Sequence, residues 1–388
     1  MMSEDVYIIG IDMIPFGRYP QRTVAQLGAE AALLALQDCG LTIQDMQALY
    51  CGNQMRAFGM VGQQILHEIG ETGIPVVNTA NACASGGTAF REGYIAVKGG
   101  IYDLVLAMGT EQLGKGLLGA ASGGRTDGFV EEGTIGSMTT PAMFSQVGME
   151  HQRKYGTKFE QFAKIAVKNH HHSTFNPKAM SRRETPLEEV MAAEMISYPN
   201  TKLMCSINVD GAAAAIIASE RKVRQLGLMG RAIRVRASEM TSNPYTPRQD
   251  AIVDFNLVTR NCANAAYERA GVGPQDLHLV ELHDCFATAE MVHYENLGLC
   301  GEGEAGRLID TGFTAIGGKI PVNLSGGLLS KGHPLGATGI ANIYEISLHL
   351  RGEAGARQVE NARIGLTHVV GGMTGMGSSC VVHILEKA

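Results

Sequence analysis

The chain has 388 residues and a formal net charge of −6, from 32 basic and 38 acidic side chains. A mildly acidic chain without a basic block is a poor partner for nucleic-acid phosphates, and a hydrophobic content of 45 % excludes a disordered chain. Charged residues make up 18 %, below the roughly 25 % typical of soluble domains. Glycine takes 49 positions, so we expect tight turns and closely packed backbone.

The N-terminal part of the chain predicts strands that alternate with helices. We expect an apolar strand over Val6–Ile11 and a helix over Thr23–Gly40, where apolar residues recur at helical spacing. A second strand, Ile74–Asn78, runs into the small-residue turn Ala84–Gly87, and a helix and the strand Asp103–Gly109 follow. This alternation is typical of βαβ units and of a mostly parallel sheet.

Residues 114–204 interrupt this alternation. The segment holds a glycine-rich run, a helical stretch over Glu160–His172 and polar turns through Asn176–Pro186. Because long segments outside a core are often functional, we expect one inserted subdomain that acts as a lid or a substrate-binding excursion.

The same order of features then appears a second time. Gly211–Ala218 is an apolar strand that closes the first half. The repeated features are the strand Ala232–Ala237, the helix Leu257–Gly271, the turn Ser325–Gly327 after Ile320–Asn323, and the strands Arg363–Gly371 and Cys380–Leu385. Chance similarity between α/β units is the alternative, but the shared order favours a duplication. Two copies predict two sheets that pack through shared helices.

The sequence predicts neither a membrane span nor a disulfide framework. The most apolar stretches, Val6–Phe16 and Ala212–Ser219, are too short to cross a bilayer, and the acidic start lacks the basic region of a signal peptide. The eight cysteines contain no C-x-x-C pair. A reducing cytoplasm is the expected compartment.

Cys83 lies in the segment Asn78–Gly87, between an apolar strand and a helix. Backbone N–H groups and a helix N-terminus near such a cysteine favour the thiolate, and small neighbours let a substrate carbonyl approach. A nucleophile is one interpretation of Cys83, and a buried structural cysteine is the other.

A glycine-rich stretch, Ser325–Gly339, contains His333 followed by Pro334, which restricts the chain. A histidine held in such a turn could act as a base toward a thiol or donate to an oxyanion. The stretch matches neither G-x-G-x-x-G nor G-x-x-x-x-G-K-[ST], which argues against a nucleotide-binding loop.

The segment Glu281–Phe286 ends an apolar strand. His283 and Cys285 lie two residues apart on this strand and are expected to face the same side, at the C-terminal strand end where α/β sheets bind ligands. Two buried structural residues are the alternative.

Together these three segments resemble the thiolase superfamily, and in particular the sterol-carrier-protein type of thiolase. The resemblance covers almost the whole chain. It rests on His-Asp-Cys-Phe at 283–286, on the Ser-Gly-Gly…Gly-His-Pro-Leu-Gly-Ala-Thr-Gly signature at 325–339, and on a loop-domain-like segment at 148–177.

The resemblance implies an α/β fold of two duplicated βαβαβαββ halves in a five-layer α-β-α-β-α sandwich with a loop-domain insertion. Residues 1–113 and 205–224 would form the N-terminal half and 225–388 the C-terminal half. Residues 114–204 would form the insertion, a lid over substrate and CoA.

The resemblance also assigns roles to residues. Cys83 would accept the acyl group, and His333 would activate it and donate to an oxyanion. Cys285 would be the acid/base thiol, since Gly371–Gly377 lacks the Cys-x-Gly cysteine of most two-cysteine thiolases, and His283 would bind an oxyanion. The residues expected in oxyanion and substrate loops are Gly371, Gly372, Met373, Gly375, Ser325 and Gly326.

The implied activity is thiolysis of a 3-oxoacyl-CoA, or the reverse Claisen condensation, with CoA as co-substrate and neither a tightly bound cofactor nor a metal. A homodimer or dimer of dimers is expected, and a small zinc-ribbon/OB-fold protein is a further candidate partner. In that complex the substrate could be an aromatic (benzoylsuccinyl-type) or steroid side-chain CoA thioester. An aldolase-type relative and a catalytically idle lipid-handling subunit are the alternatives.

Other residues carry weaker signals. We expect His170–His172 to form a solvated loop or to contact a CoA phosphate rather than to bind a metal. Lys115, Lys164 and Lys168 are candidate CoA-binding cations, and Met138, Met143 and Met149 are candidate tunnel residues.

Overall fold

The computed structural model describes residues 4–114, 140–244, 255–373 and 377–388. Its main sheet has the strand order β3-β2-β4-β7-β1-β8-β11-β10-β9. The strands in that order are Val76–Thr79, Leu49–Gly52, Leu104–Glu111, Gly211–Ser219, Val6–Met13, Ile233–Ser242, Gly377–Lys387, Ile364–Met373 and Leu279–Glu281. A separate hairpin pairs β5 (Met195–Ser197) with β6 (Asn200–Thr201).

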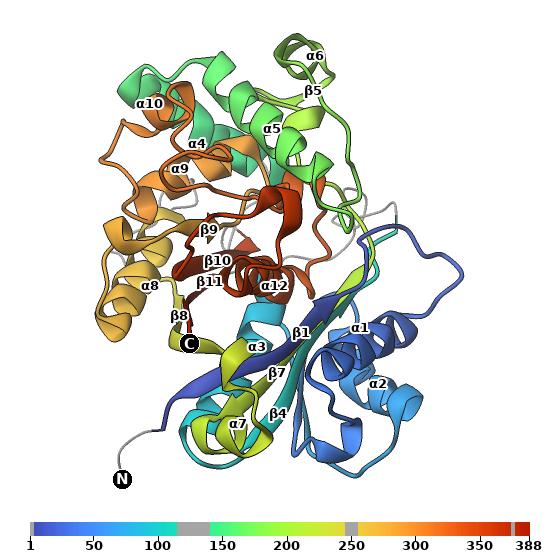
Figure 1. The fold of residues 1–388 in the computed structure, drawn as a ribbon. Helices are drawn as coiled ribbons and strands as arrows, with labels where there is room; N and C mark the ends of the chain where they lie inside the picture. The colour runs from blue at the N-terminus through green and yellow to red at the C-terminus, as the bar shows by residue number, and fades with distance from the viewer. Residues whose placement is uncertain (1–3, 115–139, 245–254, 374–376) are drawn as a thin grey trace.

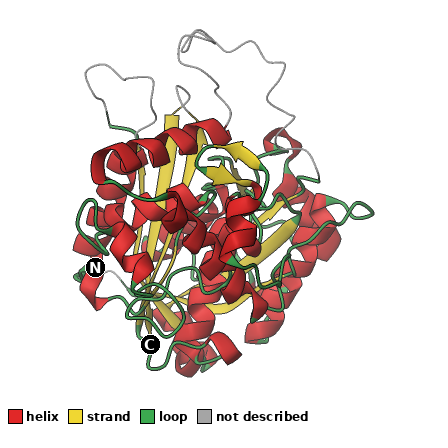
Figure 2. Cartoon of the chain, turned by 90° about the horizontal axis from the view of Figure 1, so that it is seen from above, coloured by secondary structure: helices red, strands yellow, loops and turns green. Residues whose placement is uncertain are grey.

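Helices flank and separate the two parts of this sheet (Figures 1 and 2). The helices α1 to α6 are Val24–Cys39, Val61–Ile69, Ser85–Lys98, Thr140–Tyr155, Phe159–Thr174 and Leu187–Ala192. The helices α7 to α12 are Glu220–Leu226, Phe255–Ala270, Ala287–Asn296, Ala305–Asp310, Gly327–Ser330 and Thr338–Arg351.

The two halves share one topology, which confirms the predicted duplication. In the first half β2 pairs in parallel with β3 and β4, and β7 lies antiparallel between β4 and β1. In the second half β9 pairs in parallel with β10, and β11 lies antiparallel between β10 and β8. The counterpart of β3 is reduced to a single parallel bridge between Val280 and Val322.

Two expectations about the sheet need correction. The sheet is mixed rather than mostly parallel, because only the strands joined through crossover helices run parallel. The halves are also hydrogen-bonded to each other, through two residue pairs between β1 and β8. The five layers therefore form around one continuous nine-stranded sheet.

Three apolar clusters hold the layers together. The first packs α1 and α2 on the outer side of the N-terminal half, and the second surrounds α3 and α12 between the halves. The third packs α8 and α9 against the C-terminal half. Figure 1 shows α3 and α12 side by side at the centre.

The central helices approach each other at glycines. A Cβ on Gly86 would lie 2.3 Å from the Gly336 oxygen, and one on Gly339 would lie 2.5 Å from the Gly87 nitrogen. Neither backbone atom can move aside cheaply, so only glycine permits this contact. The contact brings the N-terminal ends of α3 and α12 together, which positions the site described below.

The inserted segment packs on the C-terminal half. Its helix α5 contacts α9, α10 and α11, and α4 contacts α9. Figure 1 shows these green helices beside the orange α9 and α10. The segment therefore lies over the half that contains His283 and His333.

Candidate active site

The turn that carries Cys83 connects β3 to α3. Its backbone is unusual at Ala82, which has a positive φ of 50°. The Ala82 N–H donates to Gln54 Oε1 at 2.8 Å, and Ser85 Oγ donates to the Ala82 oxygen at 2.6 Å. Hydrogen bonds on both sides therefore hold Cys83 at the start of α3, where it is partly exposed.

His333 lies against Cys83 from the other half of the molecule. Its Nε2 is 3.2 Å from Cys83 Sγ, and its Nδ1 is 2.8 Å from Thr338 Oγ1. The Thr338 hydroxyl donates its own proton to the Pro334 oxygen at 3.0 Å, so it accepts the proton of Nδ1–H. The Nε2 lone pair is then free to accept the thiol proton, which is the arrangement of a nucleophile and its general base.

The resting pair is uncharged. Burial raises the pKa of the Cys83 thiol to about 12; the thiol's own backbone N–H opposes this and the charge of Glu111 adds to it. Burial, and then the charge of Lys331, lowers the pKa of His333 to about 3. The expectation that the turn favours a thiolate was therefore wrong, because loss of water outweighs the backbone donors.

His283 completes a group of three side chains. Ligand atoms of Cys83, His283 and His333 all lie within 4.8 Å of one another, and the two imidazole rings pack at 73° with centroids 5.1 Å apart. Within the described residues the buried Nδ1 of His283 has no hydrogen-bond partner. The pKa of His283 is lowered by burial first, and then by His333, His368 and His293. His283 is therefore a neutral imidazole facing the thiol.

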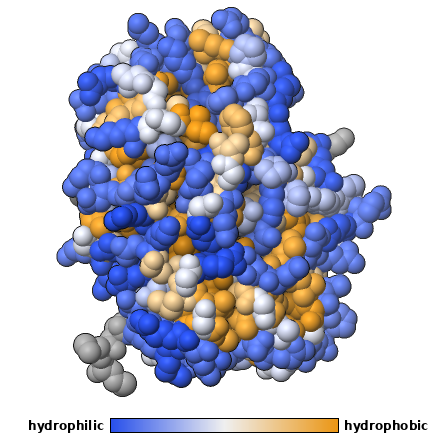
Figure 3. All heavy atoms as spheres, viewed as in Figure 1, coloured by the Kyte–Doolittle hydropathy of each residue, from blue (hydrophilic) through white to orange (hydrophobic). Residues whose placement is uncertain are grey.

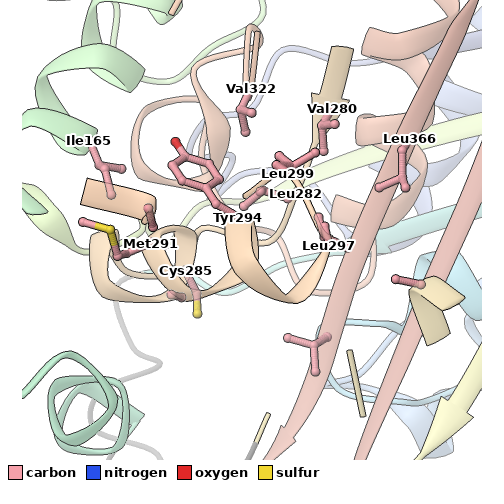
Figure 4. Packing of buried hydrophobic residues seen from close by; sticks show 14 of the residues in the cluster. Ile165, Val280, Leu282, Cys285, Met291, Tyr294, Leu297, Leu299, Val322 and Leu366 are labelled. Atoms are coloured by element: carbon pink, nitrogen blue, oxygen red, sulfur yellow. The ribbon is translucent and has the colours of Figure 1, made fainter. Parts of the chain in front are cut away.

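Cys285 lies next to this group, inside the apolar cluster of the C-terminal half. Its carbonyl accepts from the Ser206 N–H at 2.9 Å, and its side chain is 4 % exposed. Figure 4 shows its sulfur pointing away from the Tyr294 ring. Burial raises the pKa of the Cys285 thiol, and the charge of Cys83 raises it further. Cys285 is thus a protonated thiol near Cys83, as an acid would be.

The reason given for pairing His283 with Cys285 was nevertheless wrong. Strand β9 ends at Glu281, so the two residues follow the strand instead of sharing one of its faces. A buried carboxylate holds this segment instead: Asp284 accepts from the Leu328 N–H at 2.8 Å and from Asn169 Nδ2 at 2.8 Å. The segment is thereby tied to the loop that leads to His333.

Gly371, at the end of β10, lies directly against the Cys83 turn. A Cβ at Gly371 would be 2.4 Å from the Asn81 oxygen and 2.7 Å from the Cys83 nitrogen. Gly372 has a φ of 144°. Met373 is the last residue of β10, and Gly375 lies outside the described residues. The predicted oxyanion loop therefore begins beside Cys83.

Ser325 and Gly326 lie deeper, in a buried polar network. Ser325 Oγ donates to Glu281 Oε2 at 2.6 Å, and its N–H donates to Glu281 Oε1 at 3.0 Å. Gly326, at φ 96°, packs against Ser173, whose Cβ would lie 2.4 Å from an added Cβ. Their contacts connect them to the framework under the site; a part in substrate binding stays a prediction.

Glu111 and Gln54 were missed by the sequence reasoning. The buried Glu111 carboxylate accepts from the backbone N–H of Gln54 at 2.9 Å and of Gly336 at 3.2 Å. Gln54 in turn accepts from Ala82. Glu111 thus connects the turn of Cys83 to the loop of His333. Its position at the C-terminal end of an apolar strand was a signal that could have found it.

The weaker candidates have other partners. Lys168 is buried in an ion pair with Glu290, and Lys164 pairs with Glu160 and Asp310. The buried pair leaves Lys168 unavailable to a CoA phosphate, whereas Lys164 is partly exposed, and Lys115 lies outside the described residues. Of the methionines, Met143 is in the core, Met149 is 45 % exposed and Met138 is outside the described residues.

The three adjacent histidines belong to α5 and not to a solvated loop. His170 contacts Thr185, His171 contacts Glu184, and His172 Nδ1 lies 3.0 Å from the Asn323 oxygen. These partners lie at two places, residues 184–185 and Asn323, so the three side chains do not converge on one ion or phosphate.

The described part of the chain contains no helix that is both long and apolar enough to cross a membrane. The face in Figure 3 is mostly hydrophilic, with apolar patches between.

The chain matches two families of known proteins. Residues 6–190 match the thiolase N-terminal domain, and residues 238–387 match a family described as thiolase C-terminal domain-like.

Similar proteins cover nearly all of the chain. Sterol carrier protein 2 of Homo sapiens is 41 % identical over 98 % of this chain and 72 % of its own length. Acetyl-CoA acetyltransferase of Methanothermobacter thermautotrophicus is 36 % identical over 99 % of this chain and 100 % of its own length. A benzoylsuccinyl-CoA thiolase subunit of Thauera aromatica is 34 % identical over 96 % of both.

A solved structure described as the Ltp2–ChsH2(DUF35) aldolase has the same fold. Its TM-score is 0.81 at 22 % identity, and the match covers 99 % of this chain and 98 % of that one. At this identity the likeness shows the fold alone.

Proposed function

Because the chain belongs to the thiolase family, in the branch similar to sterol carrier protein 2, we propose that it transfers acyl groups between a 3-oxoacyl-CoA and CoA through an acyl–Cys83 intermediate. The observation that carries the proposal is the 3.2 Å contact between Cys83 Sγ and the unprotonated Nε2 of His333. CoA acts as a co-substrate, without a tightly bound cofactor.

The first half-reaction begins with a proton transfer. As Cys83 Sγ attacks the 3-oxo carbon of the substrate, its proton passes to His333 Nε2, and the carbonyl becomes a tetrahedral oxyanion. The Cys83 N–H, which Gly371 allows close to the C-terminal half, is a donor for this oxyanion. Met373, the last residue of β10, would extend the same loop.

Cleavage of the carbon–carbon bond follows. The electron pair leaves as the enolate of a shorter acyl-CoA, and the acyl group stays on Cys83. His283 and the protonated His333 donate to the enolate oxygen, and the Cys285 thiol protonates its carbon. The closeness of the two imidazoles supports this shared role.

The second half-reaction restores the enzyme. The Cys285 thiolate takes the proton of CoA, whose sulfur attacks the Cys83 thioester, and Cys83 leaves as a thiolate that regains its proton from His333. Run in reverse, the same steps form a carbon–carbon bond by Claisen condensation. Thiolysis in a β-oxidation-like degradation and condensation in synthesis use the same residues.

A second candidate is the same chemistry within a heteromeric complex. The similarity to a benzoylsuccinyl-CoA thiolase subunit favours it. The substrate would then be an aromatic or steroid side-chain CoA thioester, and a small zinc-ribbon/OB-fold protein would be the partner. Residues 114–204 would form the lid over the substrate in either case.

We also propose a homodimer through the free edge of β3. Strand β3 ends the sheet, and its Val77 is 42 % exposed. Two copies of an edge strand can pair antiparallel about a twofold axis, which covers both edges at once. A dimer of such dimers would need a further interface.

A reducing compartment such as the cytoplasm fits the thiols. All eight cysteines lie in described residues and are free. Free thiols at Cys83 and Cys285 are what the proposed reaction needs.

The proposal is tested by thiolysis kinetics on a panel of aliphatic, aromatic and steroid side-chain 3-oxoacyl-CoAs. Cys83→Ala should lose activity by on the order of 10⁴-fold or more, and mass spectrometry should find the acyl adduct on Cys83 of the wild type. Cys285→Ala should keep the adduct but lose turnover. Cys205→Ala is the matched control, and full activity of Cys83→Ala would falsify the proposal.

The same panel separates the alternatives. Turnover by the purified chain alone argues against an obligatory partner, and turnover that appears only when a zinc-ribbon/OB-fold protein is added supports the complex. An idle lipid-handling subunit would form no adduct on Cys83 with any substrate.

A further inference from the structure

Cys83 and the two histidines beside it also have the composition of a metal site. Cys83, His283 and His333 supply one sulfur and two imidazole nitrogens, and these atoms lie within 4.8 Å of one another. They are 200 and 50 residues apart along the chain, so no ligand-spacing motif reveals them. We propose that this group binds a thiophilic divalent cation, with Zn²⁺ as the preferred ion, and that the bound ion blocks the nucleophile reversibly.

The distances need only a small contraction. Typical zinc bonds of about 2.3 Å to sulfur and about 2.0–2.1 Å to nitrogen put tetrahedral ligand atoms roughly 3.3–3.6 Å apart. Cys83 Sγ and His333 Nε2 are already 3.2 Å apart. The His283 nitrogen lies at most 4.8 Å from the other two ligand atoms, so it has to move toward them by at most about 1.5 Å. A rotation of the His283 ring can supply this movement.

The donor atoms have little else to bind. In the described part of the chain, the polar partner of Cys83 Sγ is His333 Nε2, and the buried Nδ1 of His283 has no hydrogen-bond partner. Thr338 holds the proton of His333 on Nδ1, so the Nε2 lone pair faces the thiol. A cation therefore replaces one hydrogen bond with three coordinate bonds.

Surrounding contacts keep the ligands in position, as the outer shell of a metal site does. The His333 N–H donates to the Ile207 oxygen at 2.9 Å, and the His283 N–H donates to His368 Nδ1 at 3.4 Å. Thr338 fixes the tautomer of His333. Such second partners raise the affinity of a metal site.

The donor set determines the class of ion. One sulfur and two imidazoles suit Zn²⁺ or Cd²⁺, whereas Mg²⁺ and Ca²⁺ prefer oxygen ligands. The nearby Glu111 carboxylate is occupied by Asn53 and by backbone donors, including the Gln54 and Gly336 N–H groups. Three protein ligands leave a fourth position for water on the partly exposed side of Cys83.

Binding involves no redox change. The Cys83 S–H bond breaks, the sulfur–metal bond forms, and the proton leaves to solvent. The bound ion then occupies the sulfur that would attack a carbonyl and the lone pair that would accept its proton. Metal binding stands on the geometry alone, whereas the consequence for turnover rests on the proposed function.

The test uses chelator-treated full-length chain and two readouts that do not depend on activity. Cd²⁺ titration should produce the ultraviolet absorption of a thiolate–cadmium bond with one ion per chain. Zn²⁺ should slow the alkylation of Cys83 by iodoacetamide at least about 10-fold, as measured by peptide mass spectrometry. A factor of about 10 is the low end of the change in affinity when a metal site loses one contact. Mg²⁺ should do neither.

Variants identify the ligands. Cys83→Ala should abolish the Cd²⁺ absorption, and His283→Ala should weaken binding by at least about 10-fold. Cys205→Ala, which removes another partly exposed thiol, should bind like the wild type. Circular dichroism checks that each variant is folded, and His283→Gln provides a second variant of similar volume.

Two results overturn the inference: an unchanged Cd²⁺ signal in Cys83→Ala, or wild-type affinity in both His283 variants. If Zn²⁺ binds with the expected ligands but the chain shows no thiolysis, the metal site stands and the proposed function fails. If thiolysis occurs and Zn²⁺ neither binds nor inhibits, the proposed function stands and the metal site fails.

Discussion

The two halves of the molecule have one topology but different interiors. In the described residues of the N-terminal half, 4–113 and 205–224, the buried charged side chains are Glu111 and Asp210, and the one histidine, His67, is exposed. The C-terminal half buries several ion pairs, among them Lys331–Glu281 and Arg357–Glu345. It also buries His283, His293, His333, His349, His368 and His383.

This difference separates the apolar packing that builds the layers from the buried polar groups that hold the loops of the candidate site. Apolar faces alone suffice to build the layers, as the alanine-rich β7 illustrates. The polar interior of the C-terminal half instead holds loops: Glu281 binds Ser325 and Lys331, and Asp284 binds the Leu328 backbone. In the proposed mechanism one half thus supplies the nucleophile and the other supplies the groups that handle its proton.

Acid should affect the histidine-rich interior most. Burial is the first cause that lowers the pKa of seven histidines, to about 4 in His170 and to about 3 in His172, His293, His333 and His383. The pKa values of His283 and His368 are lowered as well. Below the unfolded pKa of about 6.5, the unfolded chain binds more protons than the folded chain. The free energy of unfolding therefore decreases as the pH decreases, by up to about 1.4 kcal/mol per pH unit for each histidine.

We therefore expect the Tm to fall as the pH falls from 6.5 toward 4, because the unfolded chain takes up protons that the buried histidines of the folded chain do not. Thermal melts followed by circular dichroism check this. The exposed His67 is the control: His67→Gln should leave the pH dependence unchanged. A constant Tm between pH 7 and pH 4.5 would mean that the buried histidines are not neutral in the folded chain.

Removal of the proposed general base, His333, should have the next largest effect. His333→Ala removes the acceptor of the Cys83 proton, so kcat/KM should fall on the order of 10²–10⁴-fold. Steady-state thiolysis kinetics measure this, with His67→Ala as the control. Activity within about twofold of the wild type would contradict the proposal that the C-terminal half supplies the base for Cys83.

Gly371→Ala should disrupt the contact between the halves. The added methyl group would lie 2.4 Å from the Asn81 oxygen and 2.7 Å from the Cys83 nitrogen, both backbone atoms. We expect at least about 10²-fold lower kcat from the displaced oxyanion donor, and a loss of about 1–3 kcal/mol of stability.

Gly230→Ala is the matched control, since a Cβ there meets nothing within 4 Å. Denaturant unfolding measures the stability of both variants, and thiolysis measures their turnover. Equal behaviour of the two variants would contradict the proposed place of Gly371 beside the nucleophile.

Thr338→Val should have the smallest effect on the reaction. The isosteric valine leaves the Nδ1 proton of His333 without an acceptor, so the tautomer with a free Nε2 is no longer favoured. We expect roughly 10-fold lower kcat with KM unchanged, since an unpaired buried donor costs about 1–3 kcal/mol. Thr338→Ser should restore kcat, and a loss shared equally by both variants would indicate a structural role.

Much of the fold was predictable from local pattern. The expected helix Thr23–Gly40 corresponds to α1, because Thr23 and Gln26 form a capping box and Gly40 ends the helix at φ 69°. Apolar runs in the sequence identified the strands. They did not predict the direction in which neighbouring strands run, and they did not predict that the second copy of β3 is reduced to one bridge. Those features depend on where neighbouring strands pair.

The candidate site was predictable in part. Motifs in the sequence pointed to Cys83, His283, Cys285 and His333, and the structure brings the first, second and fourth within one group. The contacts of Glu111 and Gln54 were not predictable, because their partners lie far away in the sequence, although the place of Glu111 at a strand end was a usable signal. The tautomer of His333 depends on the geometry of Thr338 within the folded loop.

What the linear chain determined were the residue types, the duplicated order of elements and the glycines that permit close contact. Only the tertiary structure decided the charge state of the site and its three-ligand geometry. Protonation depends on how much water the packed halves exclude, and burial at Cys83 and His333 outweighs the local donors that favour a thiolate. Convergence of atoms 200 and 50 residues apart likewise requires the two central helices to meet.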